Sequence, residues 1–139
     1  MSDDCVFCRI VKKELPCTLV YQDEDVLTFL DINPLSEGHC LLIPTQHVDR
    51  FEHCPPDVAA ALARCLGSVA RAVTLAVKAP GYNILSNNGR CAGQLVDHLH
   101  FHIIPRHPND RVFSHRPQLK YPTGRMDELA EKIKKHLAL

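Results

Sequence analysis

The pattern of hydrophobic and polar positions divides the first half of the chain into three strands and a helix. Residues 18–30 predict two short strands around a polar turn at Asp23–Asp25, and the apolar run 40–44 predicts a third strand. The Ala- and Leu-rich stretch 57–78 predicts a long helix with Asp57 as its N-cap. Apolar positions surround that helix almost completely, so we expect it to be buried on more than one side.

The second half has the same order of elements. Residues 82–87 and 95–104 predict two strands, the second ended by Pro105, and segment 107–124 predicts irregular structure because it is rich in Pro, His and Arg. Apolar side chains at helical spacing predict a last amphipathic helix over 125–138. The chain therefore predicts an α+β domain: a mostly antiparallel sheet of about five strands, with one long helix and a C-terminal helix to one side.

Composition narrows the class of protein. The 139 residues suit a single domain over 1–139, and a formal net charge of zero gives no field that would attract nucleic acid. We expect no membrane partner, because no apolar run approaches the length of a membrane span and the N-terminus lacks the apolar region of a signal peptide. Seven cysteines without a secretory signal favour reduced thiols and a cytoplasmic location.

Three histidines stand at every second position of the segment HLHFHIIPR, which spans residues 98–106. On a strand, His98, His100 and His102 share one face, roughly 6–7 Å apart along the chain. The alternate residues Leu99, Phe101 and Ile103 then share the other face, which should meet the core. The residues alone leave three interpretations open: three exposed histidines, a zinc triad with a reactive water, or a histidine nucleophile that attacks phosphorus.

The loop before the histidines, SNNGRCAGQ, bears on this choice. Gly89 and Gly93 let backbone N–H groups approach an anion, and Asn87 and Gln94 add amide donors. Phosphate is the anion that suits such a loop best. The alternative is a plain connection whose glycines merely turn the chain.

The segment from Gln94 to Arg106 resembles the signature of the histidine triad (HIT) superfamily of nucleotide hydrolases and transferases. Further motifs follow in the order and spacing of its Hint branch: Cys5-Val-Phe-Cys8-Arg-Ile, Phe29-Leu-Asp31-Ile32, Gly38-His39, Leu42-Ile43-Pro44, His47 and Asn87-Asn88-Gly89. The resemblance covers about residues 5–106 of one HIT-like domain. Residues 107–139 form a C-terminal extension that matches nothing in the family pattern.

The resemblance implies a role for each matching residue. His100 resembles the nucleophile that attacks the α-phosphorus and becomes nucleotidylated, and His102 the neighbour that contacts phosphate and assists the leaving group. Asp31 resembles the acid that holds the ribose hydroxyls, and His39 a buried histidine that supports the triad. The base pocket is implied to comprise Phe7, Ile10, Leu15, Phe29 and Ile32, and the polar positions beside the phosphate are Asn87 and Gln94.

Activity and partners follow from the same resemblance. It implies hydrolysis or transfer at adenosine phosphoramidates or related nucleotides, an AMP-type purine ligand and no catalytic metal. The alternatives are a dinucleoside polyphosphate hydrolase, a zinc enzyme that uses all three histidines, and a non-catalytic nucleotide-binding protein. It also implies a homodimer that pairs through the long helix and a sheet edge. A second contact of that helix within the monomer, for example with the C-terminal helix, is the alternative to a dimer.

The pair Cys5 and Cys8 forms a Cys-x-x-Cys motif near the N-terminus. A zinc half-site, a redox pair and coincidence all fit the spacing, although the βαβ context of a thioredoxin-like motif is missing. Some members of the family that the chain resembles complete a zinc site with residues that match His47 and His98. The resemblance thus implies a structural Cys2His2 zinc with no open position, and the alternative is two free thiols.

Two positions depart from the family pattern. Leu95 stands where a hydroxyl residue that can bond phosphate is usual, and Asp97 adds a carboxylate next to the triad. We expect Leu95 to weaken phosphate stabilisation or to shift the choice of substrate.

Overall fold

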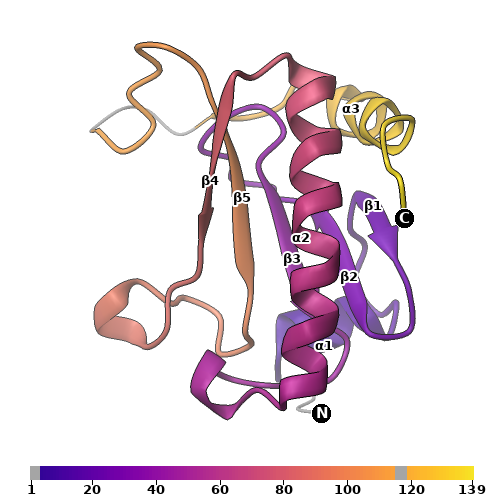
Figure 1. Ribbon diagram of the computed structural model, residues 1–139, viewed down its shortest axis with the longest axis vertical. Coiled ribbons are helices and arrows are strands. Elements are labelled where there is room, and N and C mark those ends of the chain that lie inside the picture. The colour runs from indigo at the N-terminus through magenta and orange to yellow at the C-terminus, as the bar shows by residue number, and fades with distance from the viewer. Residues whose placement is uncertain (1–3, 115–118) are drawn as a thin grey trace.

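The computed structural model describes residues 4–114 and 119–139, and within these ranges five strands form one antiparallel sheet in the order β1-β2-β3-β5-β4 (Figure 1). The strands are β1 (Leu19–Gln22), β2 (Val26–Leu30), β3 (Cys40–Pro44), β4 (Gly81–Leu85) and β5 (Phe101–Arg106). The predicted α+β class and five-stranded antiparallel sheet are confirmed. Part of the segment predicted to be irregular, residues 115–118, lies outside the described residues.

Helix α2 (Pro56–Val77) crosses one face of the sheet (Figure 1). It begins with Pro55 as N-cap and Pro56 as its first residue, so Asp57 lies in the first turn and the predicted cap is wrong. Proline suits this position because the first N–H groups of a helix have no partner within the helix. The helix ends at Lys78, whose φ of 55° is left-handed, two residues before Pro80.

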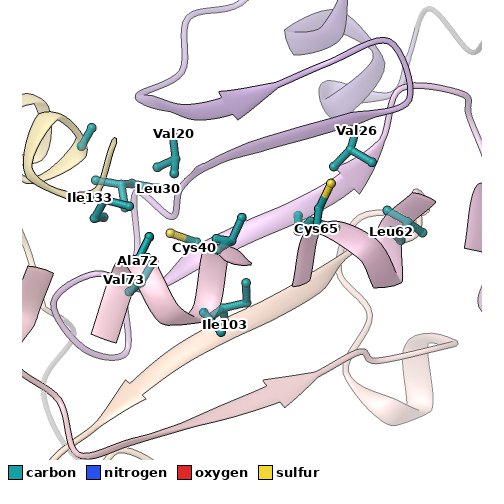
Figure 2. Close-up of a cluster of buried hydrophobic side chains, with 14 of the residues drawn as sticks. Val20, Val26, Leu30, Cys40, Leu62, Cys65, Ala72, Val73, Ile103 and Ile133 are labelled. Carbon is teal, nitrogen blue, oxygen red and sulfur yellow. The ribbon is translucent and has the colours of Figure 1, made fainter. Parts of the chain in front are cut away.

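The main core lies between α2 and the sheet (Figure 2). Leu62, Cys65 and Val73 of the helix meet residues such as Cys40 and Ile103 of the sheet. Helix α3 (Arg125–Lys134) packs against α2 and β1 and buries its own apolar side chains, Leu129, Ala130 and Ile133. By length and composition alone α2 also suits a membrane span. In this fold its buried residues pack on the sheet and on α3.

The other face of the sheet carries a short N-terminal helix, α1 (Val6–Val11), which was not predicted. Phe7 and Cys8 of α1 pack against a second cluster formed by Leu27, Phe29, Leu41 and Ile43. Six residues are too few to show a helical period in the sequence. Tertiary packing, together with the Cys5 thiol that accepts the N–H of Cys8 at 3.4 Å, forms this helix.

Strand β5 begins later and ends later than predicted. Residue Leu99 lies before the strand, and its N–H donates to the carbonyl of Val48 at 2.6 Å. At the other end, Pro105 pairs with Tyr82 of β4 inside the strand instead of ending it. The pairing with β3 has already stopped at Ile103, so on that side no neighbour needs the N–H that proline lacks.

Candidate active site

The triad histidines lie on the face of the sheet opposite to α2, as predicted, but α1 covers that face. The ring of Phe7 packs edge-on against His98 and His100, with centroids 5.8 and 5.2 Å apart. His98 and His100 are buried and His102 is partly buried, so the interpretation of three exposed histidines is wrong. On the opposite face Leu99 and Ile103 are in the core as predicted.

The protonation of His100 is set by the backbone of the triad itself. Its Nδ1 lies 2.7 Å from the carbonyl oxygen of His98, which can only accept a hydrogen bond. Nδ1 therefore carries the proton. Burial lowers the pKa of His100, so the ring favours its neutral form. A neutral ring with its proton on Nδ1 has a lone pair on Nε2, which is the form that a nucleophile requires.

His102 is held in the opposite form by a chain of hydrogen bonds. The backbone N–H of Leu35 donates to Nδ1 of His39 at 3.0 Å, so His39 carries its proton on Nε2. That nitrogen lies 2.8 Å from Nδ1 of His102, which must accept, and His102 therefore carries its proton on Nε2. Burial lowers the pKa of His39 to about 3 and that of His102 to about 4, so both rings are neutral near pH 7.

Asp31 lies beside this chain, at the end of β2. Its Oδ2 is 3.5 Å from Nε2 of His39, and its Oδ1 accepts the N–H of Asn33 at 2.8 Å. Burial raises the pKa of Asp31. The Asp31 carboxylate thus lies next to the buried histidines and is partly exposed. A ligand could therefore reach it from solvent.

The residues predicted for the base pocket divide into two sets. Phe7 and Phe29 contact each other edge-on, with centroids 5.7 Å apart, and Ile10 packs on the same cluster. Leu15 is partly buried after α1, whereas Ile32, directly after Asp31, is 73% exposed. The isoleucine side chain is thus open to solvent beside the Asp31 carboxylate. No bound ligand tests these five assignments, and they stay predictions.

In the loop before the triad, Gln94 is buried and its amide has two protein partners. Its Oε1 accepts the N–H of Gly89 at 2.7 Å and its Nε2 donates to the carbonyl of Asp49 at 2.7 Å. Asn87 makes a long contact of 3.4 Å to the carbonyl of Gly93. Gln94 therefore holds the shape of the loop through both ends of its amide. Its contact with phosphate stays a prediction. Leu95, at 81% exposure, is one of the most exposed large apolar side chains of the described residues.

The predicted metal site shares one residue with the triad, His98. Nδ1 of His98 is 3.4 Å from Sγ of Cys5 and 3.6 Å from Sγ of Cys8, and Nδ1 of His47 is 3.2 Å from the same Cys8 sulfur. Zinc with Zn–S of about 2.3 Å and Zn–N of about 2.0 Å holds tetrahedral S and N ligands about 3.5 Å apart. The Nε2 of His98 lies 2.9 Å from the carbonyl of Pro44, which orients Nδ1 toward the sulfurs. These four residues fit a structural zinc ion.

Asp31, His39 and His102 also come close enough to share an ion, but their hydrogen bonds do not fit one. A metal on Nε2 of His39 would require a proton on Nδ1, where the Leu35 N–H already donates. Nor do the three triad histidines converge. His98 faces the cysteines, His100 a carbonyl and His102 His39. The geometry thus favours hydrogen-bonded imidazoles over a catalytic metal triad.

Several groups that build this site were not identified from the sequence. The N–H of Leu35 and the carbonyls of Pro44 and His98 set the three histidine tautomers, yet they are backbone groups that every residue possesses. The hydroxyl of Ser36 donates to the carbonyl of Pro105 at 2.7 Å and ties the Asp31–His39 loop to β5. A serine in a loop gives no sequence signal for such a contact.

The HIT domain family matches residues 12–109, and the chain belongs to this family. A HIT-like protein of Methanocaldococcus jannaschii is 48% identical over 108 residues, covering 76% of this chain and 81% of the relative. The adenosine 5′-monophosphoramidase of Schizosaccharomyces pombe is 42% identical over 106 residues, 76% of each chain. An adenylylsulfatase of Arabidopsis thaliana is 42% identical over 114 residues, 82% of this chain and 58% of that longer protein.

Solved structures agree with this assignment. A zinc-bound histidine triad family protein from Mycobacterium smegmatis superposes with a TM-score of 0.82 and 34% identity, covering 96% of this chain and 92% of that chain. A HIT-like protein from Bartonella henselae gives a TM-score of 0.90 and 31% identity, covering 99% of this chain and 98% of the other. The HIT fold is therefore shared over nearly the whole chain, including the C-terminal helix.

Proposed function

We propose that this protein hydrolyses adenosine phosphoramidates, or related nucleotides, through a covalent nucleotidyl intermediate on His100. The observation that carries the proposal is the pair of opposite tautomers: His100 has its lone pair on Nε2, and its neighbour His102 has a proton on Nε2. The two rings pack edge-on with centroids 5.0 Å apart. A nucleophile and a hydrogen-bond donor thus lie side by side.

In the first step, Nε2 of His100 attacks the α-phosphorus and forms a P–N bond. The bond from phosphorus to the nitrogen of the leaving group breaks, and that nitrogen leaves as an amine with a proton taken up from solvent. Nε2–H of His102 donates to a phosphoryl oxygen and stabilises the charge that develops there. The carbonyl of His98 stabilises the positive charge on the substituted imidazole, because it accepts a hydrogen bond from Nδ1–H.

In the second step, water attacks the same phosphorus. The P–N bond to His100 breaks, the ring recovers its lone pair, and AMP leaves as one proton returns to solvent. Asp31 would bind the ribose hydroxyls, and Phe7, Phe29 and Ile32 would contact the base. No step requires the metal site, whose zinc would connect the N-terminal segment to His98 and so stabilise the floor of the active site.

Sequence relatives support the choice of reaction. The S. pombe relative is a monophosphoramidase and the A. thaliana relative an adenylylsulfatase, so both act on adenylyl compounds. A histidine nucleophile also suits the anhydride of a dinucleoside polyphosphate. A comparison of substrates that differ in their leaving group must therefore show which of them the protein prefers.

The test is hydrolysis of adenosine 5′-phosphoramidate in the presence of a chelator. We expect wild-type turnover to continue, His100→Ala to lose at least about 10³-fold in kcat, and His53→Ala, an exposed histidine away from the triad, to keep wild-type activity. Adenylyl sulfate and a diadenosine polyphosphate are run in parallel. Nucleotide binding without turnover of any of the three would contradict the proposal and leave a binding protein.

We also propose a homodimer in the cytoplasm, formed through strand β4. This strand lies at one edge of the sheet, where Tyr82 and Ile84 are 46% and 45% exposed. Phe51, 49% exposed, packs edge-on against Phe101 next to it. An apolar edge strand is a template for pairing with a second copy. The contact with α3 covers part of the apolar surface of α2, although Leu75 stays 44% exposed, so the β4 edge carries this proposal.

Light scattering after size-exclusion chromatography tests the dimer. We expect the mass of two chains for wild type and of one chain for Ile84→Glu, which places a charge on the exposed edge. Gln22→Glu at the opposite edge is the control. A monomeric wild type at concentrations above about 100 μM would contradict the proposal.

A further inference from the structure

The C-terminal extension contacts the active site from outside the part of the chain that the family match covers. That match ends at residue 109. Tyr121 and Arg125 nevertheless contact the loop between Asp31 and His39, two residues of the proposed reaction. Nothing in the mechanism given above uses the extension.

Two contacts join the extension to this loop. The hydroxyl oxygen of Tyr121 accepts the N–H of Gly38 at 2.8 Å, and Nε of Arg125 donates to Oε1 of Glu37 at 2.6 Å. Tyr121 is partly buried and packs on the main core, and burial raises the pKa of its hydroxyl to about 12. The phenol thus keeps its neutral form over the whole working pH range.

Gly38 has little room to move. Its φ of +91° lies in the left-handed region, and a Cβ on it would meet the side chains of Val73 and Val77 at 3.1 Å. The peptide is therefore held between helix α2 on one side and the Tyr121 hydroxyl on the other. Glycine is required here both for the backbone angle and for the close approach.

The turn that contains Gly38 determines the tautomer of His39. The N–H of His39 donates to the carbonyl of Ser36 at 3.1 Å, and the N–H of Leu35 donates to Nδ1 of the same histidine at 3.0 Å. The hydrogen bond from Leu35 requires the turn to keep its shape, because it joins the backbone of Leu35 at the start of the turn to the side chain of His39 at its end. His39 in turn fixes the proton on His102.

We propose that Tyr121 and Arg125 are positioning residues for this active site, which act through Gly38 and Glu37 to hold the Leu35–His39 hydrogen bond and hence the tautomer of His102. The proposal rests on the proposed function for its catalytic consequence, but not for its effect on the histidines. The proton on Nε2 of His102, which would donate to the phosphate, thereby depends on a segment outside the triad motifs.

The test combines NMR of the imidazole nitrogens with kinetics on the full chain. In Tyr121→Phe, which keeps the ring and removes the acceptor, we expect the ¹⁵N shifts of His39 and His102 to move from single tautomers toward the tautomer average. We expect kcat for adenosine 5′-phosphoramidate to fall roughly five- to tenfold, the effect of one hydrogen bond, with KM within about twofold. Glu37→Gln should act in the same direction and more weakly, because its ion pair is partly exposed.

A matched control and a double variant separate positioning from general destabilisation. Tyr21→Phe removes another partly buried hydroxyl, which donates to Asp23 at 2.8 Å far from the site, and should leave shifts and kcat unchanged. In a His39→Gln background, Tyr121→Phe should add no further loss, because the residue through which it acts is gone.

Wild-type ¹⁵N shifts in Tyr121→Phe, or a full additional loss in the His39→Gln background, would overturn the positioning role. If the wild-type protein does not hydrolyse the phosphoramidate, the proposed function fails. The nitrogen shifts still decide whether Tyr121 controls the histidine tautomers.

Discussion

His39 Nε2 lies 2.8 Å from Nδ1 of His102, and this contact fixes which nitrogen of His102 carries the proton. The direction of the bond comes from Leu35, whose N–H occupies Nδ1 of His39. A histidine outside the triad therefore determines what one triad member can donate. The same arrangement explains why Asp31, His39 and His102 suit a chain of hydrogen bonds better than a metal ion.

Removing His39 should impair chemistry more than binding. In His39→Gln we expect kcat to fall about ten- to a hundredfold, because the glutamine amide can present either its NH2 or its oxygen to His102 and no longer selects one tautomer. We expect KM to change less, since Asp31 and the apolar pocket residues remain. Steady-state kinetics with adenosine 5′-phosphoramidate measures both. A rise in KM with an unchanged kcat would show instead that His39 serves nucleotide binding.

The buried state of His39 predicts how stability depends on pH. Burial lowers its folded pKa to about 3, below the value of about 6.5 in the unfolded chain. The unfolded state therefore takes up the proton first, and the neutral histidine's contribution is complete above pH 6.5 and lost as pH falls toward 3. Both His102 and Asp31 face this ring.

We expect the stability difference between wild type and His39→Gln to shift by about 2 kcal/mol between pH 7 and pH 5, to the disadvantage of wild type. Urea unfolding at the two pH values measures it. Subtraction of the variant removes the contributions of groups present in both proteins, among them the cysteines and histidines of the metal site. A difference independent of pH would show that folding does not shift the pKa of His39.

Replacing a ligand of the metal site should lower the stability of the fold and leave the nucleophile His100 in place. In Cys8→Ser we expect bound zinc to fall from one per chain to near zero and unfolding stability to drop by about 3 kcal/mol, the linkage expected for a ligand at about a hundred times its Kd. Metal analysis and thermal unfolding measure these. Cys17→Ser, at an exposed cysteine, is the control. Equal zinc content in Cys8→Ser would exclude Cys8 as a ligand.

We predict that replacing Leu95 by a hydroxyl residue increases activity. Its side chain is 81% exposed directly after Gln94, where the family pattern has a hydroxyl residue. Leu95→Ser should raise kcat/KM for adenosine 5′-phosphoramidate several-fold, since a hydroxyl adds one donor for the phosphate or the leaving group. Leu119→Ser, an exposed leucine on the extension, is the control. A lower kcat/KM in Leu95→Ser would indicate that the leucine contacts an apolar leaving group of the preferred substrate.

The sequence was sufficient for the sheet and for the residue types of both sites. The apolar run 40–44 marked β3, and the polar turn at Asp23–Asp25 marked the boundary between β1 and β2, because a strand buried in a sheet needs apolar side chains where it meets a core. The spacing of the triad and of Cys5 and Cys8 also marked the chemistry. The resemblance brought His47 and His98 to these cysteines, and the distances between their ligand atoms confirm the grouping.

Tertiary structure alone decided how these residues work. Helix α1 depends on the packing of its apolar residues on the sheet, and it covers the face that carries the histidines. Whether His100 is a nucleophile and His102 a donor depends on the carbonyl of His98 and the N–H of Leu35, backbone groups that carry no sequence signal. The sequence by itself determined which imidazoles are present. Only the fold decided where their protons lie, because a tautomer is fixed by hydrogen-bond partners brought together in space.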